Sequence, residues 1–188
     1  MLSGLILAGG QSSRMGRDKA GLELPDGRTL VERQTSVLRD AGVERIFVSV
    51  QPASDWQWPE LTRVHDKHAN AGPLAGIAAG LQAAPPGLLL VLAVDMAGIE
   101  PAHLRRLVEL AAPGCGVVPV VAGQIEPLAA IYPTALSGSA EAMLVSGRRA
   151  VHAWATAEAA AGRIRLWTAP NDWAAAFRSW NAPADLPG

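Results

Sequence analysis

The chain of 188 residues contains a single cysteine, Cys115. One cysteine excludes an internal disulfide framework and any zinc site built from several thiolates. With no basic or histidine neighbour in the sequence, Cys115 is expected to be a small core residue rather than a nucleophile. The sequence also lacks an apolar run long enough to span a membrane. It shows no signal-peptide pattern, in which a basic segment is followed by an apolar segment and a cleavage site. We therefore expect a cytoplasmic protein.

Net charge is nearly absent as well, because sixteen Lys and Arg residues stand against seventeen Asp and Glu residues. This balance excludes a general electrostatic attraction to nucleic acid or to an anionic membrane. A polyanionic ligand would have to be met by local positive charge. With 49% hydrophobic residues, the chain is long enough for one well-buried core and short for two. We expect a single domain over residues 1–188.

Short apolar runs rich in branched residues alternate with helix-like stretches along the chain. This alternation is typical of an α/β protein with a Rossmann-like, mainly parallel twisted sheet between two helical layers, a three-layer αβα domain. The expected strands are Leu2–Leu7, Arg45–Val50, Thr62–His65, Leu88–Val94, Val117–Val121 and Ile164–Thr168.

Helix signals fall between these strands. Thr29 and Glu32 have the spacing of a capping box, and Gly42 is placed to end the helix that they begin. Further helical patterns lie at Pro73–Ala84, at Pro101–Ala112 and from Thr134 to Ala161, where Gly138 and Gly147 weaken the pattern; the segment from Trp167 onward is expected to wrap the core.

The segment after the first expected strand is rich in glycine and positive charge, and it reads L-A-G-G-Q-S-S-R-M-G-R-D-K from Leu7 to Lys19. Glycines let backbone N–H groups approach an anion, and Arg14 and Lys19 supply charge against phosphate oxygens. We interpret the segment as a phosphate-holding loop; the alternative is a glycine-rich turn with solvated cations. Because neither a Walker A triplet nor G-x-G-x-x-G occurs, kinase-like and dinucleotide-binding sites are disfavoured.

A carboxylate ends the most apolar of the expected strands. Leu88–Val94 is followed directly by Asp95, which places the acid at the edge where open α/β sheets bind ligands. Mg²⁺ takes one or two protein carboxylates and completes its coordination with water and substrate phosphates. Asp95 is therefore a candidate magnesium ligand, with a helix N-cap as the alternative.

The segment from Leu7 to Lys19 resembles the opening signature of the molybdenum cofactor guanylyltransferases, the MobA family of nucleotidyltransferases. Other segments resemble motifs of the same family in the expected order. They are G-P-L-A-G at 72–76, the acid Asp95, E-P-L-A-A-I-Y at 126–132 and N-A-P-A-D-L at 181–186.

The resemblance implies a fold of the nucleotide-diphospho-sugar transferase type and a defined reaction. Molybdenum-bound molybdopterin would attack the α-phosphate of GTP, giving the guanine dinucleotide cofactor and pyrophosphate. The implied site consists of Leu7, Ala8, Gly9 and Gly10 at base and ribose, Arg14 and Lys19 as catalytic residues at the phosphates, Asp66 in the nucleotide site, and Asp95 as the catalytic ligand of Mg²⁺. Segment 126–132 would line the pocket of the second substrate.

This chain departs from the family pattern at two positions near the implied site. Ser49 stands where relatives usually have an asparagine, and a hydroxyl cannot make the same pair of amide hydrogen bonds. Ala97 stands where many relatives have proline, two positions after Asp95. His65 and His68 flank Asp66 and are expected to be surface histidines.

Other functions stay open from the sequence. One is a cytidylyltransferase that would use CTP for the same cofactor; relatives of that kind usually open with L-A-A-G, so Gly9 and Gly10 favour guanine. Others are a non-catalytic nucleotide- or cofactor-binding protein and a nucleotidyltransferase acting on a phosphorylated sugar or polyol. The resemblance also suggests docking with molybdenum-insertion or acceptor proteins.

Overall fold

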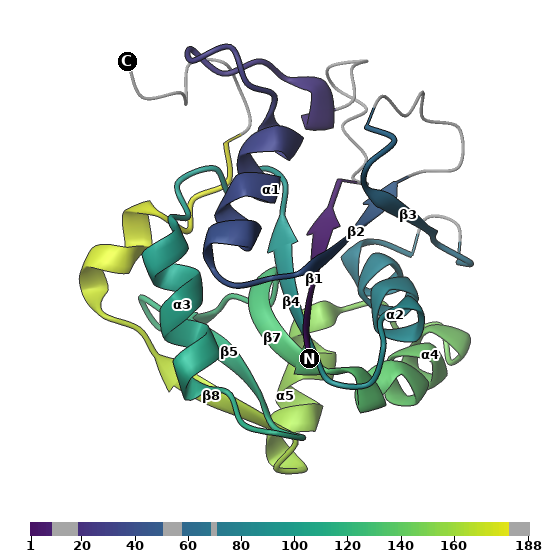
Figure 1. The fold of residues 1–188 in the computed structure, drawn as a ribbon. Coiled ribbons are helices and arrows are strands. Elements are labelled where there is room, and N and C mark those ends of the chain that lie inside the picture. Colours follow the sequence, from purple (N-terminus) through teal and green to yellow (C-terminus); the bar gives the residue numbers. More distant parts are fainter. Residues whose placement is uncertain (9–18, 51–57, 69–70, 181–188) are drawn as a thin grey trace.

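The computed structural model describes residues 1–8, 19–50, 58–68 and 71–180. These residues form one eight-stranded sheet in the order β3-β2-β1-β4-β7-β5-β6, with β8 paired to β5 (Figure 1). The strands are β1 Leu2–Leu7, β2 Arg45–Val50, β3 Thr62–His65, β4 Leu88–Ala93, β5 Gly116–Val121, β6 Gln124–Ile125, β7 Ala129–Pro133 and β8 Ile164–Thr168.

The four strands β1 to β4 form the parallel part of the sheet. β1 pairs in parallel with β2 and with β4, and β2 pairs in parallel with β3. β7 runs antiparallel to both β4 and β5, and β8 is again parallel to β5. The predicted mainly parallel sheet is confirmed, with one reversed strand inside it.

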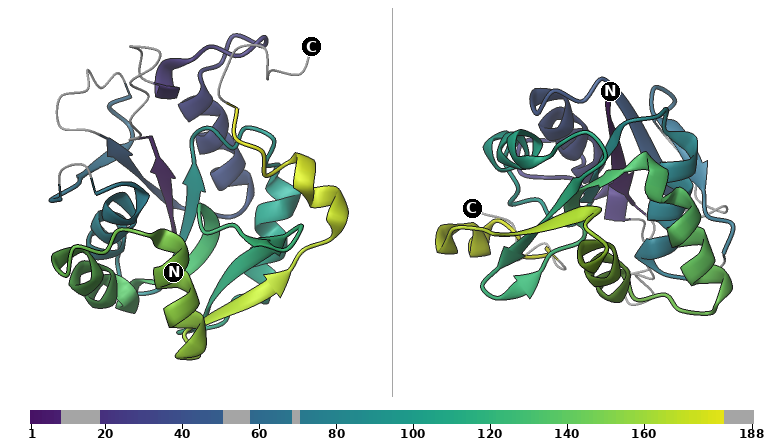
Figure 2. Two further views of the ribbon diagram at one scale, coloured as in Figure 1. Left: turned by 180° about the vertical axis from the view of Figure 1, so that it is seen from behind. Right: turned by 90° about the horizontal axis from the view of Figure 1, so that it is seen from below.

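Helices cover both faces of the sheet, as the view from below shows (Figure 2). The α-helices are α1 Leu30–Asp40, α2 Pro73–Ala83, α3 Pro101–Leu110, α4 Ser137–Val145 and α5 Val151–Ala160; short 3-10 helices are η1 Lys19–Gly21, η2 Thr134–Leu136 and η3 Asn171–Ala175. α1 and α3 contribute to one buried apolar cluster, and α2, α4 and α5 contribute to the cluster on the opposite face. The predicted three-layer architecture is therefore confirmed.

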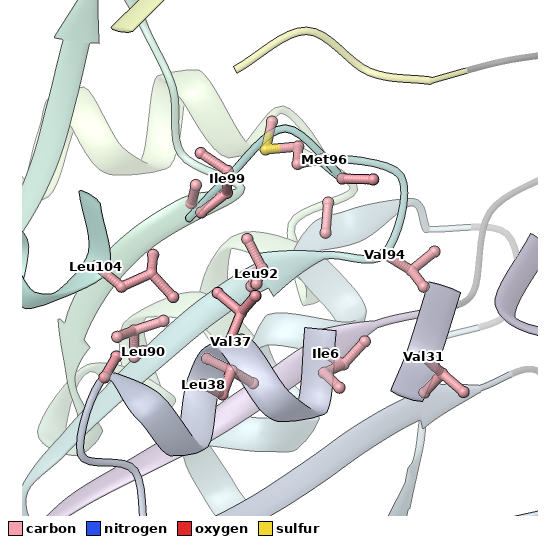
Figure 3. Packing of buried hydrophobic residues seen from close by; sticks show 14 of the residues in the cluster. Ile6, Val31, Val37, Leu38, Leu90, Leu92, Val94, Met96, Ile99 and Leu104 are labelled. Carbon is pink, nitrogen blue, oxygen red and sulfur yellow. The ribbon is translucent and has the colours of Figure 1, made fainter. Parts of the chain in front are cut away.

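Alternating side chains of the buried strands divide between the two clusters. Ile6, Leu90 and Leu92 pack against Leu38 of α1 and Leu104 of α3 (Figure 3). Leu5, Leu89 and Val91 belong to the other cluster. This alternation is what a strand buried on both faces requires.

The predicted signals at the two ends of α1 are confirmed. Thr29 Oγ1 accepts the backbone N–H of Glu32, and the Glu32 carboxylate accepts the backbone N–H of Thr29 at 2.7 Å. At the other end Gly42 has φ +92°, and Val43 N–H bonds Leu38 O at 3.1 Å. This Schellman arrangement needs a left-handed residue, which glycine supplies without steric cost.

Two sequence expectations differ from the structure, and one hairpin was not expected. The helical stretch from Thr134 to Ala161 is divided, because Gly147 at φ +79° follows α4 before α5 begins. The hairpin of β5 and β6 was missed; Ala122 and Gly123, both with positive φ, form its two-residue turn. Cys115 is partly exposed in the turn between α3 and β5 and is not a core residue.

Among the described residues, no helix is both long and apolar enough to cross a bilayer. The expectation of one domain over residues 1–188 stays a prediction, because residues 181–188 lie outside the described ranges.

Candidate active site

The carboxyl ends of the four parallel strands meet at one edge of the sheet. In the strand registers, Leu7 is the partner of Ser49 on one side and of Ala93 on the other, and Val50 is the partner of His65. The segments that follow β1, β3 and β4 therefore begin along the same edge. This edge is where ligands bind in open α/β sheets.

Leu7 and Ala8 lie between the ends of β2 and β4. Ala8 N–H donates to Ser49 O at 3.0 Å, and Leu7 O accepts the N–H of Val94 at 3.1 Å. Both residues are buried, at 7% and 8% exposure. Their side chains thus belong to the core, and a ligand at this point would meet the backbone that follows them. The predicted site residues Gly9, Gly10 and Arg14 lie outside the described residues.

The far end of the glycine-rich segment is attached to α1. Lys19 begins η1, and Ala20 beside it is completely buried. Leu30 N–H at the start of α1 donates to Leu22 O at 3.0 Å. The backbone at Lys19 is therefore anchored by a buried neighbour and by the first turn of a helix.

Asp95 follows β4 by two residues and is partly exposed at the ligand edge. It is not a helix N-cap, because Glu100 caps α3. Its carbonyl oxygen accepts the backbone N–H of Trp180 at 2.8 Å. Across the described ranges, no three His, Cys, Asp or Glu side chains gather as a metal-binding group. A cation at Asp95 would therefore need other ligands, such as water and phosphate oxygens.

Asp66 directly follows β3 and ends it with a local turn. Its Oδ1 accepts the backbone N–H of His68 at 3.0 Å. Burial raises the pKa of Asp66, while the bond from His68 opposes this rise. β2 and β1 lie between β3 and β4, so at about 4.8 Å per strand the ends of β3 and β4 are roughly 14 Å apart. This separation disfavours a single metal ion shared by Asp66 and Asp95.

His68 is a partly exposed histidine, as the sequence suggested, but it has a partner that the sequence did not indicate. Its Nε2 lies 2.8 Å from Oε1 of Glu141, which belongs to α4. The partner is remote in sequence, so spacing alone had no signal for it. His65 is exposed, as predicted.

Gly76 and Ser49 are in close contact below the ligand edge. A Cβ on Gly76 would lie 2.6 Å from Ser49 Oγ and 2.9 Å from Leu7 Cδ2. The glycine in the G-P-L-A-G motif thus lets α2 approach the ends of β1 and β2. Ser49, at 4% exposure, is buried beneath this contact.

The E-P-L-A-A-I-Y segment reaches the same edge from the opposite direction. Leu128 O accepts the N–H of Ala93 at 2.8 Å, and β7 begins one residue later. Burial raises the pKa of Glu126, which is half-buried before this point. Tyr132 is fully buried and donates to Pro127 O at 2.7 Å. Tyr132 therefore fastens the turn before β7 and does not line a pocket.

The C-terminal segment forms an aromatic cluster on α3 that the sequence did not indicate. The ring of His103 contacts Trp173 edge-on at 4.7 Å between centroids, and Phe177 stacks on Trp173 at 5.8 Å. The expected wrapping of the core is confirmed as far as Trp180. The N-A-P-A-D-L motif at 181–186 lies outside the described residues.

This sheet order and its covered faces define a nucleotidyltransferase fold, that of the nucleotide-diphospho-sugar transferases. The molybdopterin-guanine dinucleotide biosynthesis protein A of Archaeoglobus fulgidus has the same fold at a TM-score of 0.70, with 24% identity over 98% of this chain and 94% of that one. The 2-C-methyl-D-erythritol 4-phosphate cytidylyltransferase of Thermus thermophilus has a TM-score of 0.71, with 20% identity over 96% of this chain and 93% of that one.

Sequence similarity narrows the class to a family. The MobA-like NTP transferase domain matches residues 4–178. A probable molybdenum cofactor guanylyltransferase of Opitutus terrae is 40% identical over 91% of this chain and 86% of its own length. A probable molybdenum cofactor guanylyltransferase of Chloroflexus aggregans is 33% identical over 84% of this chain and 77% of its own length. The chain belongs to the MobA-like NTP transferase family, as its motifs predicted.

Proposed function

We propose that this protein transfers GMP from GTP to molybdenum-bound molybdopterin. The observation that supports this most directly is the hydrogen bond from Val94 N–H to Leu7 O, at 3.1 Å. It joins the end of β1, from which the glycine-rich segment continues, to the end of β4, from which Asp95 follows. In a chain 40% identical to a relative named as a probable guanylyltransferase, this juxtaposition favours the same reaction.

The reaction is an exchange of phosphoanhydride partners. A phosphate oxygen of the pterin substrate forms a bond to the α-phosphorus of GTP, and the bond from that phosphorus to the bridging oxygen of pyrophosphate breaks. The products are the guanine dinucleotide cofactor and pyrophosphate. Such a step depends on positioning and charge neutralisation rather than on a protein nucleophile.

In this proposal the backbone from Leu7 to Gly10 contacts base and ribose. Arg14 and Lys19 neutralise the phosphates and the leaving pyrophosphate, and Asp66 contributes to the nucleotide site. The anchored backbone at Ala20 supports such a role for Lys19, because a chain segment that is already ordered loses less entropy on binding.

Asp95 would hold Mg²⁺. Its partly exposed carboxylate at the ligand edge, with no three-residue metal cluster among the described residues, fits an ion that takes few protein ligands and relies on phosphate oxygens. When bound, Mg²⁺ would offset phosphate charge. Asp95 itself would orient the ion beside the end of β1.

Two alternatives stay open. The protein could be an enzyme that uses CTP as the nucleotide donor, or it could be a carrier that binds a nucleotide without turning it over. The Gly9-Gly10 pair favours GTP, and the retained Lys19 and Asp95 favour an enzyme. We further expect a cytoplasmic location and docking with proteins that insert or accept the molybdenum cofactor, because the pterin product must be passed on.

The decisive experiment measures pyrophosphate release with Mg²⁺ and freshly released molybdenum–molybdopterin, comparing GTP, CTP and ATP at equal concentrations. Release with GTP alone supports the proposal. Preference for CTP assigns the sister activity. Tight GTP binding without release, with the pterin substrate shown to be intact, indicates a carrier.

A further inference from the structure

The loop that connects β4 to α3 is held by two adjacent side chains of α1. Gln34 is completely buried, and its Nε2 donates to Ala93 O at 3.2 Å and to Val94 O at 3.3 Å. These carbonyls directly precede Asp95. The buried amide of Gln34 is thus satisfied by the backbone of the loop that carries the proposed metal ligand.

Arg33 holds the other end of the same loop. Its Nη1 donates to Ile99 O at 3.0 Å, and its Nη2 lies 2.8 Å from the carboxylate of Glu100, the N-cap of α3. The side chain of Arg33 is only 12% exposed. The same Nη1 donates to Gln34 Oε1 at 3.2 Å. The two side chains thus form one connected unit that contacts the loop at both ends, at Val94 O and at Ile99 O.

α1 also contacts the segment that begins at Lys19. Besides the bond from Leu30 N–H to Leu22 O, residues Glu23 and Thr29 form an antiparallel bridge just before the helix. One rigid helix is therefore fastened to both parts of the proposed site, at its first turn to the Lys19 segment and one turn later to the Asp95 loop.

We propose that Gln34, braced by Arg33, is a positioning residue that holds the loop carrying Asp95 in place relative to the backbone of the segment that begins at Lys19. This inference rests on the proposed metal role of Asp95. Gln34 bonds the two backbone carbonyls before Asp95, so it acts by holding the loop from which the carboxylate projects, and loss of such support changes the geometry of a site before it unfolds the protein. Two backbone bonds of this loop, from Val94 N–H to Leu7 O and from Trp180 N–H to Asp95 O, do not involve Gln34 and should stay in place when it is replaced.

The test replaces Gln34 by methionine, which keeps the length and removes the donors. The matched control is Thr35→Val on the same helix: Thr35 is also buried, and its Oγ1 donates only within α1, to Val31 O at 2.7 Å. Both variants lose one buried polar group, so both should melt at lower temperature. Only Gln34→Met should change the properties of the Asp95 loop.

Three readouts separate positioning from simple stability. In the presence of GTP, Mn²⁺ affinity measured by electron paramagnetic resonance should fall about tenfold in Gln34→Met and stay constant in Thr35→Val. Amide hydrogen exchange of residues 94–99 should become faster in the first variant alone. In turnover, Gln34→Met should lower kcat and raise the Mg²⁺ requirement with little change in KM for GTP.

The outcomes distinguish this inference from the proposed function. Unchanged Mn²⁺ affinity and loop exchange in folded Gln34→Met overturn the positioning role. If Gln34→Met does not fold, Arg33→Met is tested by the same readouts. Arg33→Lys should then give an Mn²⁺ affinity and a loop exchange rate between those of Arg33→Met and the wild-type protein, because lysine restores one donor. If Asp95→Asn keeps the Mn²⁺ affinity of the wild-type protein, the metal role of Asp95 fails instead.

Discussion

The backbone N–H of Trp180 donates a 2.8 Å hydrogen bond to the carbonyl oxygen of Asp95. The C-terminal segment reaches this point after its 3-10 helix η3 has packed Trp173 against His103 of α3. The bond therefore gives the loop of the proposed metal ligand a second support besides α1. The C-terminal segment, although it has little regular structure, thus helps to hold the loop that carries Asp95.

Shortening the chain tests this contact. A protein that ends after Ser179 lacks the Trp180 donor, whereas one that ends after Ala182 keeps it. We expect the shorter form to lose about tenfold in kcat, which corresponds to about 1.4 kcal/mol of misplaced transition-state contacts. Steady-state pyrophosphate release measures the effect, and thermal melting reports stability in parallel. Equal kcat in the two truncated forms would show that the bond has no role in turnover.

Replacing Asp95 by asparagine should abolish Mg²⁺-dependent turnover, with a loss of at least about a hundredfold, because the amide cannot offset the ion's charge. The fold should persist, since the Asp95 bond to Trp180 uses only the carbonyl oxygen. Pyrophosphate release over a Mg²⁺ titration and circular dichroism measure the two effects. Retention of Mg²⁺-dependent activity would remove Asp95 from the metal site.

His103 should make the protein less stable in weak acid. Burial against the aromatic cluster lowers the pKa of His103, although Glu100 opposes the shift, and the neutral Nδ1 accepts the N–H of Glu100 at 3.0 Å. A lowered pKa in the folded state means that the stability contribution is present above about pH 6.5 and is lost as the pH falls further.

The control for this pH effect is His103→Gln, which can keep the acceptor at the third position of α3 but does not titrate. Unfolding by urea at pH 7.5 and pH 5 should show a larger loss of stability in the wild-type protein than in the variant. An identical loss in both proteins would assign the acid sensitivity to other groups.

Gly76→Ala should destabilise the protein by about 1–3 kcal/mol, because the new Cβ would meet Ser49 Oγ at 2.6 Å inside a packed core. Gly138→Ala is the control: in α4, with no atom within 4 Å of the added carbon, it should stabilise by about 0.5–1 kcal/mol. Adding Ser49→Ala to Gly76→Ala should recover part of the loss. Simple additivity in this double-mutant cycle would contradict the contact.

Asp66→Asn should raise the melting temperature at pH 7 while weakening GTP binding about tenfold. Burial raises the pKa of Asp66, so its ionised form opposes folding above about pH 4. An asparagine oxygen can still accept the N–H of His68. The gain in melting temperature should disappear below pH 4, where both side chains are neutral. Unchanged GTP affinity in a calorimetric titration would exclude Asp66 from the nucleotide site.

Local signals made most elements predictable from the sequence. The capping box at Thr29, the proline at the first position of α2 and of α3, and the apolar run that ends before Asp95 depend on neighbours within a few residues. The buried parallel strands were also predictable, because both of their faces are covered and their sequences are therefore near-continuous apolar runs. The β5–β6 hairpin was missed because Ala122 is an unusual residue at a positive φ.

By itself, the sequence determined the three-layer fold, the family and the candidate residues, because caps, turns, apolar runs and motifs act over short spans of chain. Only the tertiary structure decided which groups meet: His68 with Glu141, Gln34 with the carbonyls before Asp95, and Trp180 with Asp95 itself. Each of these contacts joins segments far apart in the chain. The strand order and helix packing bring them together, and no local pattern specifies such pairs.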